Sequence, residues 1–190
     1  MRLRRIVFGV ALLTALGASC AAQFVVFPKA SEVVSPDGRF AVRSVERETA
    51  ASEIAGASRS LWLFEISTGH ARKLCDYLGV AAAGWSGNDW IVVTQYVGKR
   101  TSRALVFSAT VAEDPLMLDK NGLIRLVPPD LRPALRENDH VFVEASHVEH
   151  DKLSLTVWGY GPHNTNGFRW RCEYSLREGT VSCSEEPGAR

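Results

Sequence analysis

Chemistry-bearing side chains gather in residues 147–151, which read His-Val-Glu-His-Asp, with His140 a short distance before them. Imidazoles and carboxylates are ligands that zinc accepts, so this cluster is a candidate metal site. In an extended strand, however, His147 and His150 point to opposite faces. The sequence therefore favours a polar turn between two strands over a metal centre.

The sequence lacks the familiar motifs of enzyme active sites. The sequence contains no Gly-x-Ser-x-Gly elbow, Walker loop, dinucleotide fingerprint or His-Glu-x-x-His pair. We predict a non-enzymatic protein with no catalytic residue, no cofactor and no metal. The alternative is a metal-dependent or other hydrolase of the periplasm, which would use His147, His150, Asp151 or His163.

The segment 159–167 (Gly-Tyr-Gly-Pro-His-Asn-Thr-Asn-Gly) lies between Trp158 and Phe168. It combines glycines, amide side chains and aromatic neighbours, a composition that suits a binding loop on a rigid scaffold. A long hairpin connection is the alternative. The candidate binding residues are Tyr160, His163, Asn164 and Asn166.

Two cysteines fall opposite one another in an expected hairpin. From residue 168 to 176 apolar and polar residues alternate, which is typical of a half-buried strand. Cys172 lies on its apolar face, and Arg169 and Arg171 lie on the other face. A turn at residues 176–179 then brings Cys183 opposite Cys172 and keeps the apolar residues on one side. We predict a Cys172–Cys183 disulfide. Cys75 is expected to be a small buried apolar residue, with pairing to a partner chain as its alternative role.

The N-terminus has the layout of an export signal. Arg2, Arg4 and Arg5 precede an apolar stretch at residues 6–16, and small residues follow. The apolar stretch is shorter than the roughly 20 residues of a membrane span, so a permanent transmembrane helix is the weaker interpretation. Export places the remaining cysteines where disulfides form.

Residues 16–20 (Leu-Gly-Ala-Ser-Cys) resemble the lipobox of bacterial lipoproteins. The resemblance implies that residues 1–19 are removed and that Cys20 is acylated, anchoring the protein to a membrane. Ala21 stands where aspartate favours inner-membrane retention in that family, so the resemblance implies the outer membrane of the bacterial envelope, facing the periplasm. Ordinary cleavage near residue 22, leaving a soluble periplasmic protein, remains the alternative.

Composition is that of a single globular domain. Hydrophobic residues make up 46% and charged residues 23% of the chain. Removing the three arginines of the signal changes the formal net charge from +1 to −2. A mildly acidic mature chain makes nucleic acid an unsuitable partner.

Short apolar runs separated by turn residues predict an all-β domain over residues 35–186, preceded by a tether at 20–34. Prolines at 115, 128, 129 and 133 predict an irregular crossover at 113–138 with at most a short helix. The expected strands are 40–46, 60–67, 71–76, 80–85, 90–97, 103–111, 140–148, 152–160, 168–176 and 180–183.

Within residues 35–97, a Ser-Pro-Asp-Gly turn opens a strand, Ser67-Thr68-Gly69 closes a hairpin, and residues 85–89 (Trp-Ser-Gly-Asn-Asp) open another. This order resembles the blade repeat of TolB-like β-propellers. The chain is too short for the four or so blades that a closed propeller needs. We therefore expect an antiparallel β-sandwich or an incomplete, propeller-like arrangement of sheets.

Together these features predict an exported envelope lipoprotein that binds a protein partner, with an inhibitor or immunity-type protein as one form of that role. A structural component of the envelope is a further alternative.

Overall fold

The computed structural model describes residues 24–46, 54, 56–98, 100–162 and 164–186. Strands take up 58% and helices 9% of this part, and the strands form three antiparallel sheets without a closed barrel. The all-β, single-domain prediction is confirmed. The expected signal (1–19), Cys20 and the cleavage positions near residue 22 lie outside the described residues.

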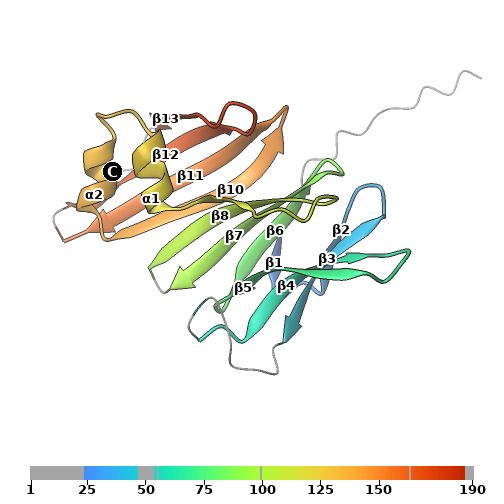
Figure 1. The fold of residues 1–190 in the computed structure, drawn as a ribbon. Coiled ribbons are helices and arrows are strands. Elements are labelled where there is room, and N and C mark those ends of the chain that lie inside the picture. Colours follow the sequence, from blue (N-terminus) through green and yellow to red (C-terminus); the bar gives the residue numbers. More distant parts are fainter. Residues whose placement is uncertain (1–23, 47–53, 55, 99, 163, 187–190) are drawn as a thin grey trace, which may run out of the picture.

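The N-terminal sheet is a meander of four strands in the order β2-β3-β4-β5 (Figure 1). Two of its three connections are the predicted Ser-Pro-Asp-Gly and Ser-Thr-Gly turns, where Gly38 and Gly69 adopt positive φ values of 72° and 71°. The strands are β2 (Glu32–Val34), β3 (Phe40–Glu46), β4 (Arg59–Glu65) and β5 (Ala71–Tyr77).

The central sheet has five strands in the order β1-β6-β7-β8-β9. All of its neighbouring strands are antiparallel, and β1 joins from the N-terminal side of the chain to pair with β6. The strands are β1 (Val25–Phe27), β6 (Ala81–Ser86), β7 (Trp90–Gly98), β8 (Thr101–Ser108) and β9 (Leu116–Leu118).

The C-terminal sheet is a second four-stranded meander, in the order β10-β11-β12-β13. Every strand predicted from the sequence forms, with shifts of a few residues at the ends. The strands are β10 (His140–Glu149), β11 (Lys152–Gly161), β12 (Asn164–Ser175) and β13 (Val181–Glu185).

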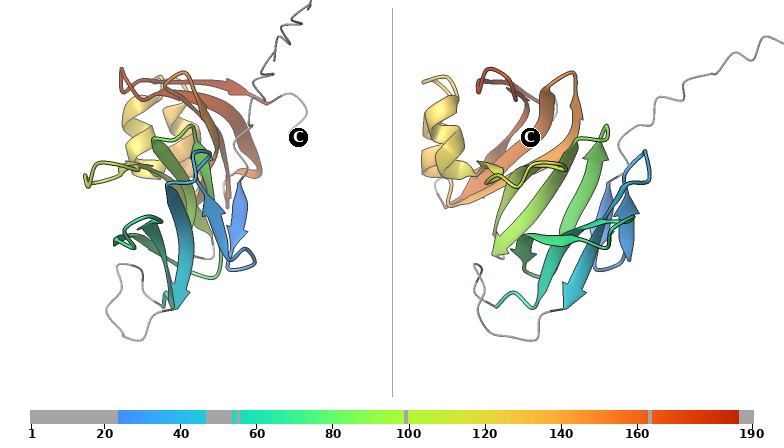
Figure 2. Two further views of the ribbon diagram at one scale, coloured as in Figure 1. Left: turned by 90° about the vertical axis from the view of Figure 1, so that its right-hand side faces the viewer. Right: turned by 45° about the vertical axis from the view of Figure 1, so that its right-hand side comes forward.

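The three sheets are layered, with the central sheet between the other two (Figures 1 and 2). Side chains alternate along a strand, so neighbouring residues of β7 enter different cores. Val92 packs toward the C-terminal sheet, whereas Ile91 and Val93 pack toward the N-terminal sheet. Burial on both faces explains the continuous apolar runs at residues 90–93 of β7 and 104–107 of β8.

Side-chain hydroxyls of the central sheet cover the free edge of β10. Ala145 N–H donates to Thr94 Oγ1 at 2.9 Å, and Val143 N–H donates to Ser102 Oγ at 3.0 Å. The Ser102 hydroxyl in turn donates to the Val143 carbonyl at 3.1 Å. These bonds satisfy edge groups that would otherwise be open to another strand, and they fix where the C-terminal sheet sits on the central one.

The crossover contains β9 and two short helices, α1 (Lys120–Leu126) and α2 (Arg132–Glu137). Asp119 caps α1, because its carboxylate accepts a hydrogen bond from Gly122 N–H at 2.7 Å. Leu123 and Leu135 bury one side of each helix in the core beneath the C-terminal sheet. The prediction of at most one short helix was too low. α1 lies between Pro115 and Pro128, and α2 carries Pro133 in its first turn, where a helix tolerates proline.

The predicted tether differs from the structure. Residues 25–27 and 32–34 form β1 and β2, and Phe27 is fully buried in the core between the N-terminal and central sheets. Strands of three residues carry no measurable alternation, so their pattern was hidden in the sequence. The tether can therefore extend only over the residues before 24, which lie outside the described part.

The Cys172–Cys183 disulfide is confirmed, with a Cα–Cα distance of 4.1 Å. The register is the predicted one, with Tyr174 opposite Val181. Backbone bonds from Ser175 N–H to Thr180 O and from Glu186 N–H to Arg169 O place the two cysteines at a non-hydrogen-bonded position. Cys75 is 3% exposed and belongs to the core between the N-terminal and central sheets.

Among the described residues, no helix is long and apolar enough to cross a membrane.

Candidate functional site

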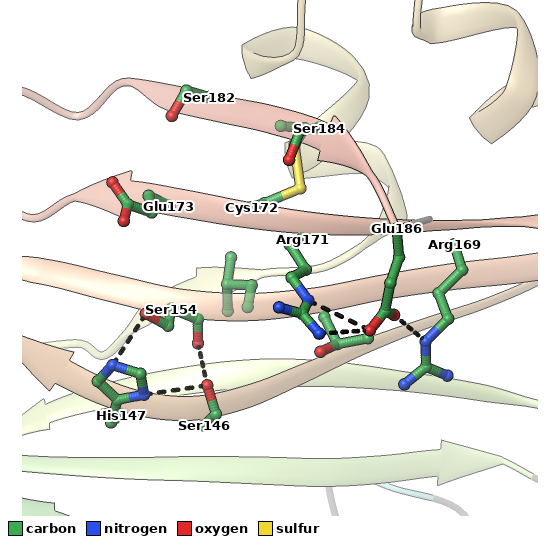
Figure 3. Close-up of a pocket in the computed structure, with 13 residues that line it drawn as sticks. Ser146, His147, Ser154, Arg169, Arg171, Cys172, Glu173, Ser182, Ser184 and Glu186 are labelled. Carbon is green, nitrogen blue, oxygen red and sulfur yellow. Dashed lines mark hydrogen bonds and ion pairs between the residues drawn. A yellow bond between two sulfur atoms is a disulfide. The ribbon is translucent and has the colours of Figure 1, made fainter. Parts of the chain in front are cut away.

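The outer face of the C-terminal sheet, opposite the core, carries both polar and aromatic side chains. A groove of about 800 Å³ runs along it, which we call the polar groove (Figure 3). Its polar lining residues are Ser146, His147, Ser154, Thr156, Arg169, Arg171, Glu173, Ser182, Ser184 and Glu186.

A β-bulge brings His147 to this face. The register between β10 and β11 shifts between Ala145 and His147, so Ser146 is the extra residue. Ala145 and Val148 pack on the core side, and the bulge lets His147 point outward between them. Without the bulge, alternation would turn His147 into the core.

His147 contacts two serine hydroxyls in the polar groove. Its Nε2 lies 3.2 Å from Ser154 Oγ and its Nδ1 lies 3.3 Å from Ser146 Oγ (Figure 3). A serine beside an imidazole is the start of a hydrolase triad, but a carboxylate holds the second ring nitrogen in that arrangement. Here a hydroxyl takes that place, and both His147 and Ser146 are exposed. The cluster thus presents hydrogen-bonding groups at the surface in an arrangement that differs from that triad.

The other members of the predicted histidine cluster lie apart from it. His150 and Asp151 form the turn between β10 and β11 with φ values of 48° and 62°, and the His150 side chain is 90% exposed. His140 contacts the Tyr160 ring and Arg100 instead. Across the described part of the chain, no three His, Cys, Asp or Glu residues gather closely enough to hold a metal ion.

Arg169 and Arg171 form an arginine pair at alternate positions of β12, and both bind the carboxylate of Glu186. Arg171 donates through Nη2 at 2.8 Å and Nε at 3.2 Å, and Arg169 donates through Nε (Figure 3). These hydrogen bonds, from Arg171 first and then Arg169, lower the pKa of Glu186 below its usual value. The pair therefore meets an ionised carboxylate.

Three stacked aromatic rings continue this face beyond the arginine pair. The Phe142 and Trp158 rings stack with centroids 3.9 Å apart, and the Tyr160 ring lies 6.3 Å from each of them. Trp158 is the cross-strand neighbour of Arg169, so the aromatic cluster adjoins the arginine pair. Tyr160 is 41% exposed, which makes it the member of the cluster most open to solvent.

The predicted binding loop at 159–167 is instead a strand hairpin. β11 continues to Gly161 and β12 starts at Asn164, and these two residues pair. The glycines allow close approach rather than mobility, because a Cβ on Gly159 would lie 2.6 Å from the His140 carbonyl oxygen. Of the predicted binding residues, Tyr160 and Asn166 are exposed, Asn164 begins β12, and His163 lies outside the described residues.

The sequence did not single out Arg169, Arg171 and Glu186 as site residues. Alternation along residues 168–176 already placed both arginines on the outward face. The return of Glu186 to them depends on the β12–β13 hairpin, whose register the cysteines define. That register was the one signal in the sequence that linked the arginine pair to the C-terminal segment.

Comparisons with protein-family models, with curated proteins and with solved structures found no match to this chain.

Proposed function

We propose that this chain is an exported, lipid-anchored protein of the bacterial envelope that binds a protein partner through the outer face of its C-terminal sheet. The main support for a binding role is that the aromatic cluster lies next to the arginine pair on the same face. Aromatic residues and arginine dominate the binding energy of protein interfaces, because they combine large buried area with directed polar contacts. An inhibitor or immunity-type protein is one form of this role.

Export and anchoring rest on the N-terminal sequence. A basic start, a short apolar stretch and the lipobox-like residues before Cys20 support removal of the signal and acylation of that cysteine. The disulfide is compatible with an oxidising compartment. The intact mass of the protein recovered from membranes tests this part: acylation adds the mass of lipid to a chain that starts at Cys20, whereas ordinary cleavage gives an unmodified chain that starts later.

Photo-crosslinking in cells tests the binding role. A photoreactive phenylalanine analogue at Tyr160 is expected to give a discrete crosslinked species. Trp158→Ala should lower the yield of this species, because it removes the ring beside Arg169. The matched control places the same analogue at Ile66, which is 50% exposed in the N-terminal half of the chain. Equal crosslinking at the two positions, or none at Tyr160, would contradict binding through this face.

A further inference from the structure

The arginine pair binds a carboxylate that belongs to the chain itself. Two guanidinium groups from alternate residues of one strand converge on the single carboxylate of Glu186. Guanidinium groups match carboxylates in geometry and charge, which makes such contacts selective as well as attractive. The arginine pair therefore has the geometry to bind a carboxylate.

The guanidinium groups that bind Glu186 remain open to solvent. The backbone N–H of Glu186 donates to Arg169 O at 3.0 Å, one residue beyond the end of β13. The side chains of Arg169 and Arg171 are 45% and 73% exposed, so water competes for both. The Glu186 side chain itself is 21% exposed. An incoming carboxylate that replaces it can make the same contacts with the two guanidinium groups.

The surroundings fit an extended peptide better than a small anion. The polar groove continues from the arginine pair past Thr156 and Ser154 to His147, so hydroxyl and imidazole groups line its length. Glu173, on the same face, already pairs with Lys152 at 3.1 Å. A single anion would use only the arginine end, whereas a strand-like segment can also use the hydroxyl groups.

We propose that the arginine pair is the docking site for an acidic, extended segment of the protein partner, and that Glu186 is a built-in competitor which this segment displaces. This inference rests on the proposed function and specifies the chemistry of the partner. The Glu186 side chain thereby lowers the apparent affinity of the polar groove until an acidic ligand displaces it.

Fluorescence anisotropy with a labelled peptide of alternating glutamate and serine tests the proposal on the mature chain. The matched probe has glutamine in place of glutamate. We expect the acidic peptide to bind more tightly than the neutral one. Glu186→Gln should increase its affinity about tenfold, because the fraction of open sites rises. The double variant Arg169→Gln, Arg171→Gln should lose the preference for the acidic peptide.

Glu173→Gln is the matched control, since it removes the same charge from the same face without touching the arginine pair. If Glu186→Gln raises affinity no more than Glu173→Gln does, the competitor role is wrong. Inorganic phosphate that displaces the acidic peptide as readily as unlabelled peptide does would also overturn the proposal, by indicating a general anion site. Thermal unfolding of each variant confirms that the sheet is intact.

The two proposals can fail separately. Crosslinking from Tyr160 that persists in the double arginine variant would overturn the acidic-segment proposal and leave partner binding in place. Conversely, selective peptide binding that responds to Glu186→Gln, together with no crosslinking from Tyr160 in cells, would support the recognition chemistry and count against the cellular role.

Discussion

Asp37, in the turn between β2 and β3, makes the stability of this turn depend on pH. Its Oδ1 accepts hydrogen bonds from Ser35 Oγ at 2.7 Å and from Arg39 N–H at 3.1 Å, and Oδ2 contacts Arg39 Nε. The hydrogen bond from Ser35, followed by those from Arg39, lowers the pKa of Asp37 from 3.8 to about 2. The turn therefore prefers the ionised carboxylate.

A pKa that is lower in the folded state than in the unfolded state makes the protein less stable as the pH falls. The stabilisation from Asp37 is complete above pH 3.8 and is lost as the pH falls through about 2. Asp37→Asn keeps an acceptor in the turn but cannot titrate. We expect its free energy of unfolding to fall less steeply than that of the wild type between these pH values. Urea unfolding at both pH values measures this change. An equal loss of unfolding free energy in the two proteins would contradict the assignment.

At the scale of elements, the sequence predicted strands where alternation was long and failed where it was short or interrupted. The alternating residues around Cys172 gave the hairpin, its register and the disulfide. The three-residue strands β1, β2 and β9 have no period to detect, and the glycines of 159–167 resembled a loop. In that hairpin the glycines are needed because distant segments approach closely, which no local pattern encodes.

The same alternation predicted the positions of only some residues of the candidate site. It predicted that Arg169 and Arg171 share the outward face of β12. It did not predict the bulge that turns His147 outward, because the extra residue, Ser146, is defined by pairing with β11 rather than by its own type. Nor did it predict the aromatic stack, which brings Phe142 of β10 against Trp158 of β11.

Gly159→Ala tests whether glycine in this hairpin serves packing. The added Cβ would lie 2.6 Å from the His140 carbonyl oxygen and 2.8 Å from the Phe168 ring. We expect destabilisation of about 1–3 kcal/mol, since the backbone or the ring must shift. Gly98→Ala, at the end of β7, is the matched control, because its nearest contact would be Thr101 Oγ1 at 3.7 Å. Similar melting temperatures for the two variants would show that the hairpin is mobile at Gly159.

At the scale of the whole molecule, the central sheet is shared by two cores. Leu105 is 2% exposed in the core with the N-terminal sheet, and Leu155 is 2% exposed in the core with the C-terminal sheet. β8 contributes to both cores, since Val106 faces the opposite side from Leu105. The outer sheets are thus coupled through the layer between them.

This coupling predicts a single unfolding transition. Leu105→Ala and Leu155→Ala should each cost about 2–5 kcal/mol by leaving a cavity in one core. Because the central sheet cannot lose one packed face and keep the other unaffected, each variant should lower amide-exchange protection in both outer sheets by a similar amount. Hydrogen exchange measured strand by strand checks this. Loss of protection confined to the sheet next to the substitution would mean that the two cores unfold separately, and that the polar groove rests on a layer able to unfold without the rest of the chain.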